Sequence, residues 1–286
     1  MTITEIEPTT TGGQQSSLRV FKELQQGTEE WFYQRCGIVT ASVVGQLVTS
    51  RQPTAIETDC PECGSLTAEP CIGKRSPAPL KTLHPARAAA ARGMDRVISA
   101  DHNSDTSRAL TLHLAAERIT GFVEPTFTSA DMERGNLDEP YARGSYSEHY
   151  TAATEVGFMV RDFGTYRIGY SPDGLVGDDG LIEIKSRRQK IQLKTILAGE
   201  VPLENMAQIQ TGLLVSGRDW LDYVSYSGGM PLYVKRVPPS PVWFNAIIEA
   251  VQTLEETVTK IIETYETSVK GMPLTDRIDH YEEMVF

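Results

Sequence analysis

The sequence contains few cysteines, no long apolar run and no excess of positive charge. No segment approaches the about 18 apolar residues that a membrane-spanning helix needs, and no charged, apolar, small-residue signal opens the chain. With 27 Lys and Arg against 38 Asp and Glu, the formal net charge is −11. That charge excludes a protein that coats nucleic acid by bulk charge, but not one that binds DNA in a local groove. We therefore expect a soluble, cytoplasmic protein.

The length of 286 residues fits one large domain or two ordinary ones, and 40% hydrophobic with 23% charged residues is typical of a globular chain. The polar, small residues over 1–20 predict a disordered arm. We expect a main domain over 21–270 and a tail over 271–286. Residues 51–100, rich in Pro, Cys, Lys and Arg, are expected to be an insertion in that domain.

Periodicity along the chain predicts an α/β protein in which helices flank a mixed sheet. Helices are expected from Thr28, from Thr40, over 106–120, over 131–150, over 206–217 and from about Pro241. Strands are expected over 165–171 and 181–186, joined as a β-hairpin by the turn GDDG. Two more strands are expected over 221–227 and 231–237. We find no internal repeat.

Three charged residues on the predicted hairpin indicate a metal-dependent reaction. Glu183 and Lys185 are two residues apart, so both project from one face of a strand, and the hairpin would bring Asp173 beside them. Buried carboxylates repel unless a cation lies between them, and hard oxygen ligands select Mg²⁺ or Mn²⁺. This arrangement suits metal-assisted phosphodiester hydrolysis, with Glu139 of the preceding helix as a further ligand. The alternative is a solvated, charged strand.

Five sequence blocks in order make the chain resemble the phage lambda-type recombination exonucleases of the PD-(D/E)xK nuclease superfamily. The resemblance covers about residues 26–259 without the cysteine insertion. Its blocks are Trp31 with Arg35 and GIVTAS (37–42), GNLDEPYAR (135–143), SPDGL (171–175), LIEIK (181–185) and MAQIQ (206–210). The resemblance implies a restriction-endonuclease-like central sheet and makes 21–270 the exonuclease domain.

By this resemblance, Asp173, Glu183 and the Ile184 carbonyl hold the first Mg²⁺ or Mn²⁺, Glu139 assists them, and Lys185 is catalytic. Asp162 matches another acidic position only loosely.

Four further residues fall where this family binds the 5′-phosphate of the strand being digested: Arg35, Ser42, Ser171 and Gln208. Arginine is a charge-assisted donor to phosphate, and serine and glutamine donate hydrogen bonds to its oxygens. The alternatives are that Ser42 belongs to a helix cap and that Gln208 is an exposed helical residue.

The resemblance also implies an activity and partners. The family digests double-stranded DNA from its ends, 5′ to 3′, and leaves a 3′ single strand for phage-type homologous recombination. It works with a single-strand annealing protein and forms a ring-shaped homotrimer, here in a bacterial host or from a prophage. Two alternatives stay open: a nuclease of the same superfamily with other polarity or endonuclease action, and a DNA-end-binding scaffold without catalysis.

Cysteines in the insertion predict a structural zinc site. Cys60, Cys63, Cys71 and His84 have the spacing C-x2-C-x7-C-x12-H, and three thiolates with one imidazole suit tetrahedral Zn²⁺. This pattern resembles small zinc-ribbon-like modules of actinobacterial and phage proteins, which the lambda-type enzyme lacks. The alternative is a reduced, metal-free loop.

Basic residues follow the cysteines, opposed only by Asp95. They make the insertion either a DNA-backbone contact or a solvated basic face: Lys74, Arg75, Lys81, Arg87, Arg92 and Arg96.

Overall fold

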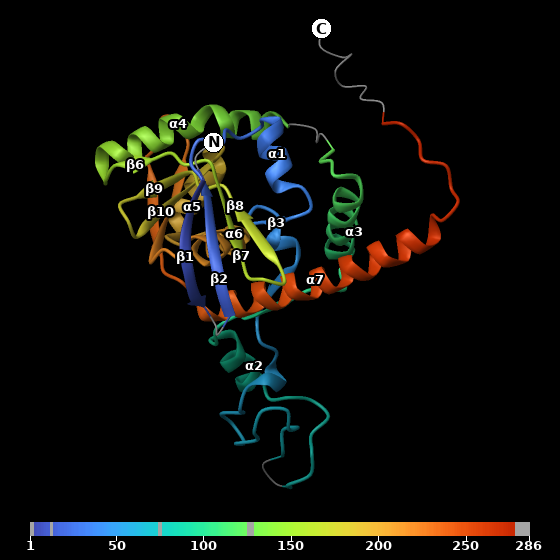
Figure 1. Cartoon of the computed structure of the whole chain (residues 1–286). Coiled ribbons are helices and arrows are strands. Elements are labelled where there is room, and N and C mark those ends of the chain that lie inside the picture. Colours follow the sequence, from blue (N-terminus) through green and yellow to red (C-terminus); the bar gives the residue numbers. More distant parts are fainter. Residues whose placement is uncertain (1–2, 12–13, 74–75, 125–128, 278–286) are drawn as a thin grey trace.

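Two five-stranded sheets and a two-stranded sheet, with helices against them, make up the fold of this computed structural model (Figure 1). The structure describes residues 3–11, 14–73, 76–124 and 129–277, with side chains from Ser16 onward. The predicted mixed α/β fold is confirmed, although the strands are divided between two larger sheets rather than joined in one.

The first sheet has the strand order β1-β2-β7-β8-β3. Its strands are β1 (Ile3–Thr11), β2 (Gln14–Phe21), β7 (Phe158–Asp162), β8 (Arg167–Tyr170) and β3 (Val39–Thr40). The disordered arm expected over 1–20 is therefore wrong for the described part. Leu18 and Val20 are buried at alternating positions of β2, and residues 17–21 pair with β7, so this segment is an inner strand.

The second sheet has the order β12-β11-β10-β9-β6. Its strands are β12 (Tyr233–Val237), β11 (Trp220–Tyr226), β10 (Gly180–Ser186), β9 (Gly174–Val176) and β6 (Ala153–Thr154). Strands β10 and β11 are parallel, and β9 and β10 form an antiparallel hairpin. The two strands predicted over 221–227 and 231–237 are confirmed as β11 and β12.

The predicted pairing of 165–171 with 181–186 is wrong. Strand β8 pairs with β7 and β3 of the first sheet, and the hairpin partner of β10 is the short strand β9. The chain passes from one sheet to the other at residues 171–173, where Pro172 has no amide proton for a strand ladder. Asp173 still reaches β10, because it immediately precedes the strand that pairs with it.

Helices lie against both sheets. They are α1 (Glu29–Arg35), α2 (Pro85–Arg92), α3 (Asp105–Thr120), α4 (Ala130–His149), α5 (Gln189–Ala198), α6 (Leu203–Ser216) and α7 (Pro241–Ser268). Short 3-10 turns occur at Val44–Gln46 and Ala55–Glu57. The predicted cap at Thr28 is confirmed, since its side chain accepts a hydrogen bond from Trp31 N at 3.3 Å.

The helix expected from Thr40 is wrong. Val39–Thr40 pairs in parallel with β8, and the chain then makes a 3-10 turn before strand β4 (Val48–Arg51). The β-branched valines of this segment favour extended backbone, and tertiary pairing decides the outcome.

Two apolar clusters hold the layers together. The larger one joins α6 and α7 to the first sheet and includes the buried residues Ile168, Leu213 and Ile247. The smaller one lies between α4 and the second sheet, where Tyr146 packs with Ile182 and Ile184. Helix α4 is thereby fixed against β10, the strand that carries Glu183 and Lys185.

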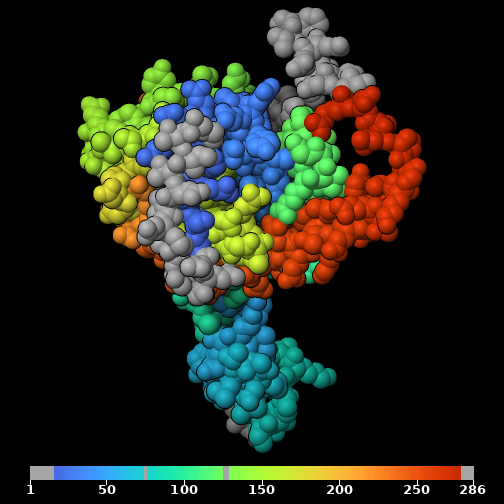
Figure 2. Space-filling view, in the orientation of Figure 1, coloured from blue at the N-terminus to red at the C-terminus, as the bar shows by residue number. Residues whose placement is uncertain are grey.

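The cysteine-containing segment extends away from these layers. It leaves the body at β4 and returns at β5 (Val97–Ala100), which pair with each other as the two-stranded sheet. Figure 2 shows it, coloured blue to teal, as a separate lobe below the rest of the molecule.

Candidate active site and metal centre

One cavity of about 350 Å³ is lined by every residue predicted for the catalytic and 5′-phosphate sites. Those residues are Arg35, Ser42, Glu139, Ser171, Asp173, Glu183, Ile184, Lys185 and Gln208. They come from α1, the segment after β3, α4, the crossover between the sheets, β10 and α6. The fold therefore brings together residues that lie far apart in the sequence.

Strand alternation on β10 separates reactive side chains from packing side chains. Ile182 and Ile184 pack toward α4, while Glu183 and Lys185 line the cavity. The carboxylate of Glu183 is 1% exposed, and Lys185 Nζ lies 2.7 Å from its Oε1. Tyr170, which the sequence did not single out, donates its hydroxyl to Glu183 Oε2 at 3.2 Å.

Asp173 is held by the backbone of the neighbouring strand. The amide of Ile184 donates to its Oδ2 at 2.5 Å, which aims the carboxylate toward β10. Burial, and then repulsion from Glu183, raises the pKa of Asp173 well above its usual range. Burial favours the neutral amine of Lys185, but attraction from Glu183 and Asp173 outweighs burial and raises the pKa of this lysine. The site thus favours additional positive charge.

Glu139 faces the same cavity from α4. Burial raises its pKa, against the effect of the Arg143 guanidinium, which forms an ion pair with it one helical turn further on. Arg143 also donates to the backbone carbonyl of Asp173 at 2.7 Å and contacts Glu155 at 2.8 Å. Arg143 is the last residue of the block GNLDEPYAR (135–143), but the sequence did not predict a role for it.

Three of the residues predicted to bind a 5′-phosphate, Arg35, Ser42 and Ser171, are linked through Trp31 and Thr40. The Arg35 guanidinium lies 3.9 Å from the ring centroid of Trp31, and its NH2 donates to Thr40 Oγ1 at 3.4 Å. Burial lowers the pKa of Arg35. The hydroxyl of Thr40 is 3.1 Å from that of Ser42, and Ser171 accepts from the Trp31 indole at 3.3 Å.

The structure excludes the alternatives for two of the predicted residues. Gln208 is not an exposed helical residue, because its Nε2 donates to Glu183 Oε1 at 2.5 Å. Ser42 does not cap a helix, since it follows strand β3. Asp162 lies outside the residues that line the cavity, and its carboxylate accepts from Gly164 N at 2.7 Å in the β7–β8 turn.

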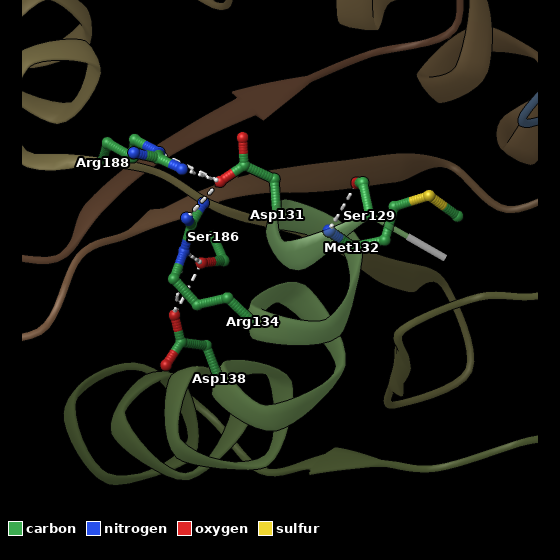
Figure 3. A network of polar contacts seen from close by, with 7 residues as sticks. All are labelled: Ser129, Asp131, Met132, Arg134, Asp138, Ser186 and Arg188. Carbon is green, nitrogen blue, oxygen red and sulfur yellow. Dashed lines mark hydrogen bonds and ion pairs between the residues drawn. The ribbon is translucent and has the colours of Figure 1, made fainter. Parts of the chain in front are cut away.

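A polar network beside the cavity fastens the start of α4 to the end of β10 (Figure 3). Asp131 Oδ1 contacts both Arg134 and Arg188, and Ser186 links Arg134 to Asp138. Asp131 and Ser186 also line the cavity. Helix spacing predicts the pair of Asp131 with Arg134, which are three residues apart on α4. It does not predict the pair of Asp131 with Arg188, which are 57 residues apart.

The predicted zinc ligands converge in the insertion. Ligand atoms of Cys60, Cys63, Cys71 and His84 all lie within 4.8 Å of one another. Gly64, with φ 73°, lets the chain turn back directly after Cys63, so that its amide bonds to the Cys60 carbonyl at 2.8 Å. A hydrogen bond from Ser65, and then one from the Ile72 backbone, lowers the pKa of Cys63 to about 5. These donors fit zinc.

Arg87 was predicted among the basic residues of the insertion that contact DNA or solvent, and the structure corrects this. Its side chain is fully buried and donates to the carbonyls of Thr58, Glu69 and Leu66, with NH1 also 3.6 Å from Cys71 Sγ. Arg96 bonds to Ser50. Lys81 and Arg92 are exposed, whereas Lys74 and Arg75 lie outside the described residues.

Comparisons with known proteins agree with this site. Residues 85–219 match the model of the YqaJ-like viral recombinase domain, and residues 39–103 match a family described as a DNA-binding phage zinc finger domain. The predicted resemblance to phage-type exonucleases with a zinc module is confirmed. No curated protein matches the chain.

Among solved structures, the alkaline exonuclease LHK-Exo from Laribacter hongkongensis is similar. It has a TM-score of 0.62 and 27% identity, over 86% of this chain and 100% of that chain. The structure of LHK-Exo in complex with dAMP has a TM-score of 0.61, with 27% identity over the same shares of the two chains. Within the described residues, no helix is both long and apolar enough to cross a membrane.

Proposed function

We propose that this chain is a deoxyribonuclease that digests double-stranded DNA from its ends, because residues 85–219 match the model of the YqaJ-like viral recombinase domain. We further propose that it works 5′ to 3′, depends on Mg²⁺ or Mn²⁺, and leaves 3′ single-stranded overhangs for phage-type recombination. The observation that carries the proposal is the cavity that joins the carboxylates of Glu139, Asp173 and Glu183 to Lys185 and the half-buried Arg35.

The carboxylates fit a divalent cation. Asp173, Glu183, the carbonyl of Ile184 and Glu139 would hold it, since hard oxygen donors suit Mg²⁺. Burial first, and neighbouring carboxylates second, raise the pKa values of Asp173 and Glu139, and a bound cation would offset both effects. When bound, the metal supplies Lewis acidity and lowers the pKa of a coordinated water. Lys185 Nζ, next to Glu183, orients the attacking water and carries positive charge beside the phosphate.

The proposed polarity rests on the residues around Arg35. A terminal 5′-phosphate carries more charge than an internal phosphodiester, so it favours the site with a desolvated guanidinium. Arg35 supplies that charge, with Ser42, Ser171 and Gln208 as neutral donors. Binding the 5′ end here would place the first phosphodiester beside Lys185 and the carboxylates.

Linear duplex DNA labelled separately at its 5′ and 3′ ends tests the proposal. We expect Mg²⁺-dependent release of 5′ label first, inhibition by EDTA, and faster digestion of 5′-phosphorylated than of 5′-hydroxyl ends. Early release of 3′ label would contradict the proposed 5′ to 3′ polarity. Internal cuts in circular DNA would indicate an endonuclease. Binding of ends without any cleavage would indicate a scaffold.

The remaining predictions belong to this proposal. We propose that residues 51–100 form a module with one structural Zn²⁺ on Cys60, Cys63, Cys71 and His84, within an exonuclease domain over 21–270. The protein would act in the cytoplasm of a bacterial host as a homotrimer, together with a single-strand annealing protein. Deleting the module should weaken DNA binding and reduce its salt dependence while leaving Mg²⁺ chemistry intact.

A further inference from the structure

The segment that follows the catalytic lysine is strongly basic on an acidic protein. From residue 184 to residue 199 the chain has no carboxylate, but it has Lys185, Arg187, Arg188, Lys190 and Lys194. Arg187 turns inward, where its NH2 bonds to Asn205 and Tyr223. The other residues beyond the cavity, Arg188, Lys190 and Lys194, are all exposed, and we call them the basic ridge.

The ridge begins at the cavity mouth. Ser186 lines the cavity, and Arg188 follows two residues later as the residue that precedes helix α5. Lys190 and Lys194 are four residues apart on α5, so they lie on one side of it, about 6 Å apart along the axis. That spacing is close to the rise of two phosphates on one strand of duplex DNA, at about 3.4 Å each.

Arg188 forms an ion pair with Asp131 that a phosphate group can replace. Its Nε lies 3.0 Å from Asp131 Oδ1 and its NH2 lies 2.9 Å from the same oxygen (Figure 3). Arg134 contacts that oxygen too, so Arg188 lacks the two-oxygen contact that makes arginine–carboxylate pairs strong. The side chains of Arg188 and Asp131 are 67% and 57% exposed, which makes their pair weak in water.

We propose that the basic ridge binds the phosphate backbone of duplex DNA that enters the cavity, and that Arg188 exchanges Asp131 for a phosphate when DNA binds. A phosphate offers Arg188 two oxygens and releases counterions, which the Asp131 pair does not. The exchange leaves Asp131 paired with Arg134, so the Asp131 carboxylate keeps a cationic partner. The inference rests on the proposed action on DNA.

Duplex binding measured by fluorescence anisotropy in EDTA, over a series of KCl concentrations, tests the ridge without cleavage. For Arg188→Gln we expect weaker binding and a plot of log K against log salt whose slope falls by about 0.9, the value for one lost phosphate contact. The triple variant with Lys190→Gln and Lys194→Gln should lose about three such contacts. Asp131→Asn should bind severalfold more tightly, because its carboxylate no longer competes with phosphate.

The matched control is a second exposed arginine–aspartate pair. Arg108 and Asp105 on α3 are 58% and 98% exposed and pair in the same way, and neither lines the cavity. Arg108→Gln and Asp105→Asn should match the wild type in slope and affinity. An Arg188→Gln slope equal to that of the wild type, or no tightening by Asp131→Asn, would overturn the proposal.

This outcome is separable from the exonuclease proposal. If the wild-type protein binds duplex DNA but releases no nucleotide with Mg²⁺, the exonuclease proposal fails while the ridge is still scored by its salt slope. If the wild-type protein digests DNA and the ridge variants keep the wild-type slope, only the ridge proposal fails.

Discussion

Nε of Arg143 donates a hydrogen bond to the backbone carbonyl of Asp173 at 2.7 Å. The same guanidinium forms an ion pair with Glu139, so one side chain fixes two of the proposed metal ligands relative to each other. Arg143 is only 11% exposed, which keeps competing water away from these contacts. The distance between α4 and the crossover at residues 171–173 is thereby set by a residue that need not touch the substrate.

Arg143→Gln should weaken metal binding and also lower the stability of the fold. Partners that orient metal ligands typically contribute about 10–100-fold in affinity, so we expect the Mg²⁺ concentration at half-maximal activity to rise by about that factor. Losing the charged hydrogen bonds should also cost about 1–3 kcal/mol of unfolding free energy. Mg²⁺ titration calorimetry and urea unfolding measure the two effects.

Glu155→Gln is the control, because Glu155 contacts Arg143 while its side chain is 74% exposed. An unchanged Mg²⁺ affinity in Arg143→Gln would contradict the positioning role.

Asp173→Asn should stabilise the metal-free protein at neutral pH. The pKa of Asp173 is raised in the folded state, so stability is lost as pH rises from the unfolded-state value, about 3.9, through the folded value. Each pKa unit of that rise corresponds to about 1.4 kcal/mol. In EDTA, the Tm of Asp173→Asn should exceed that of the wild type near pH 7, and the difference should vanish below about pH 4, where Asp173 is protonated in both states.

The effect of Mg²⁺ on the Tm is a second test of Asp173→Asn. It should raise the Tm of the wild type by mass action and leave the Tm of Asp173→Asn nearly unchanged. Asp178→Asn, in the exposed turn between β9 and β10, should behave like the wild type in both measurements. A Tm of Asp173→Asn below that of the wild type in EDTA would show that the carboxylate stabilises the metal-free site.

Cys71→Ser should remove zinc without removing the Mg²⁺ response. Cys71 is fully buried within the Cys60, Cys63 and His84 group, and a hydroxyl is a poor substitute for a thiolate ligand. Elemental analysis should show about one Zn per chain in the wild type and less in the variant. Proteolysis should then cut between β4 and β5, since the lobe would lose its metal crosslink. Cys36→Ser is the control, because that thiol contacts the Glu117 carbonyl and lies outside the group. Full zinc content in Cys71→Ser would exclude Cys71 as a ligand.

Short-range patterns predicted the chemistry better than the topology. Glu183 and Lys185 share a strand face whatever that strand pairs with, so their alternation was sufficient to place them in one cavity. The partner of β10 was not predictable in this way, because β8 and β9 are separated only by residues 171–173 and both carry strand signals. The contacts of Tyr170 with the Glu183 carboxylate and of Arg143 with the Asp173 carbonyl depend on that crossover, and the sequence offers no local signal for them.

The N-terminal strands also depend on long-range pairing that local sequence patterns did not predict. Polar, small residues predict disorder, but β2 pairs with β7, which is more than 100 residues away in the chain, and β1 pairs with β2. Sequence spacing did predict that Cys60, Cys63, Cys71 and His84 come together, because all four lie in one segment. It did not show that Arg87 is buried among carbonyls, since an arginine in a basic run is usually exposed.

Arg35→Lys should reduce the preference for a 5′-phosphate while keeping the charge. Arg35 lies over Trp31 and contacts Thr40, and its planar fork can reach two phosphate oxygens, which a lysine ammonium cannot do. Charged hydrogen bonds contribute about 1.5–3 kcal/mol, so the ratio of digestion rates on 5′-phosphate and 5′-hydroxyl duplexes should fall about tenfold or more. Arg236→Lys is the matched control, since Arg236 lies 3.5 Å over Trp220 and pairs with Asp222, and neither Arg236 nor Trp220 lines the cavity. Equal rate ratios for the wild type and Arg35→Lys would remove Arg35 from phosphate recognition and leave the proposed polarity without its charged contact.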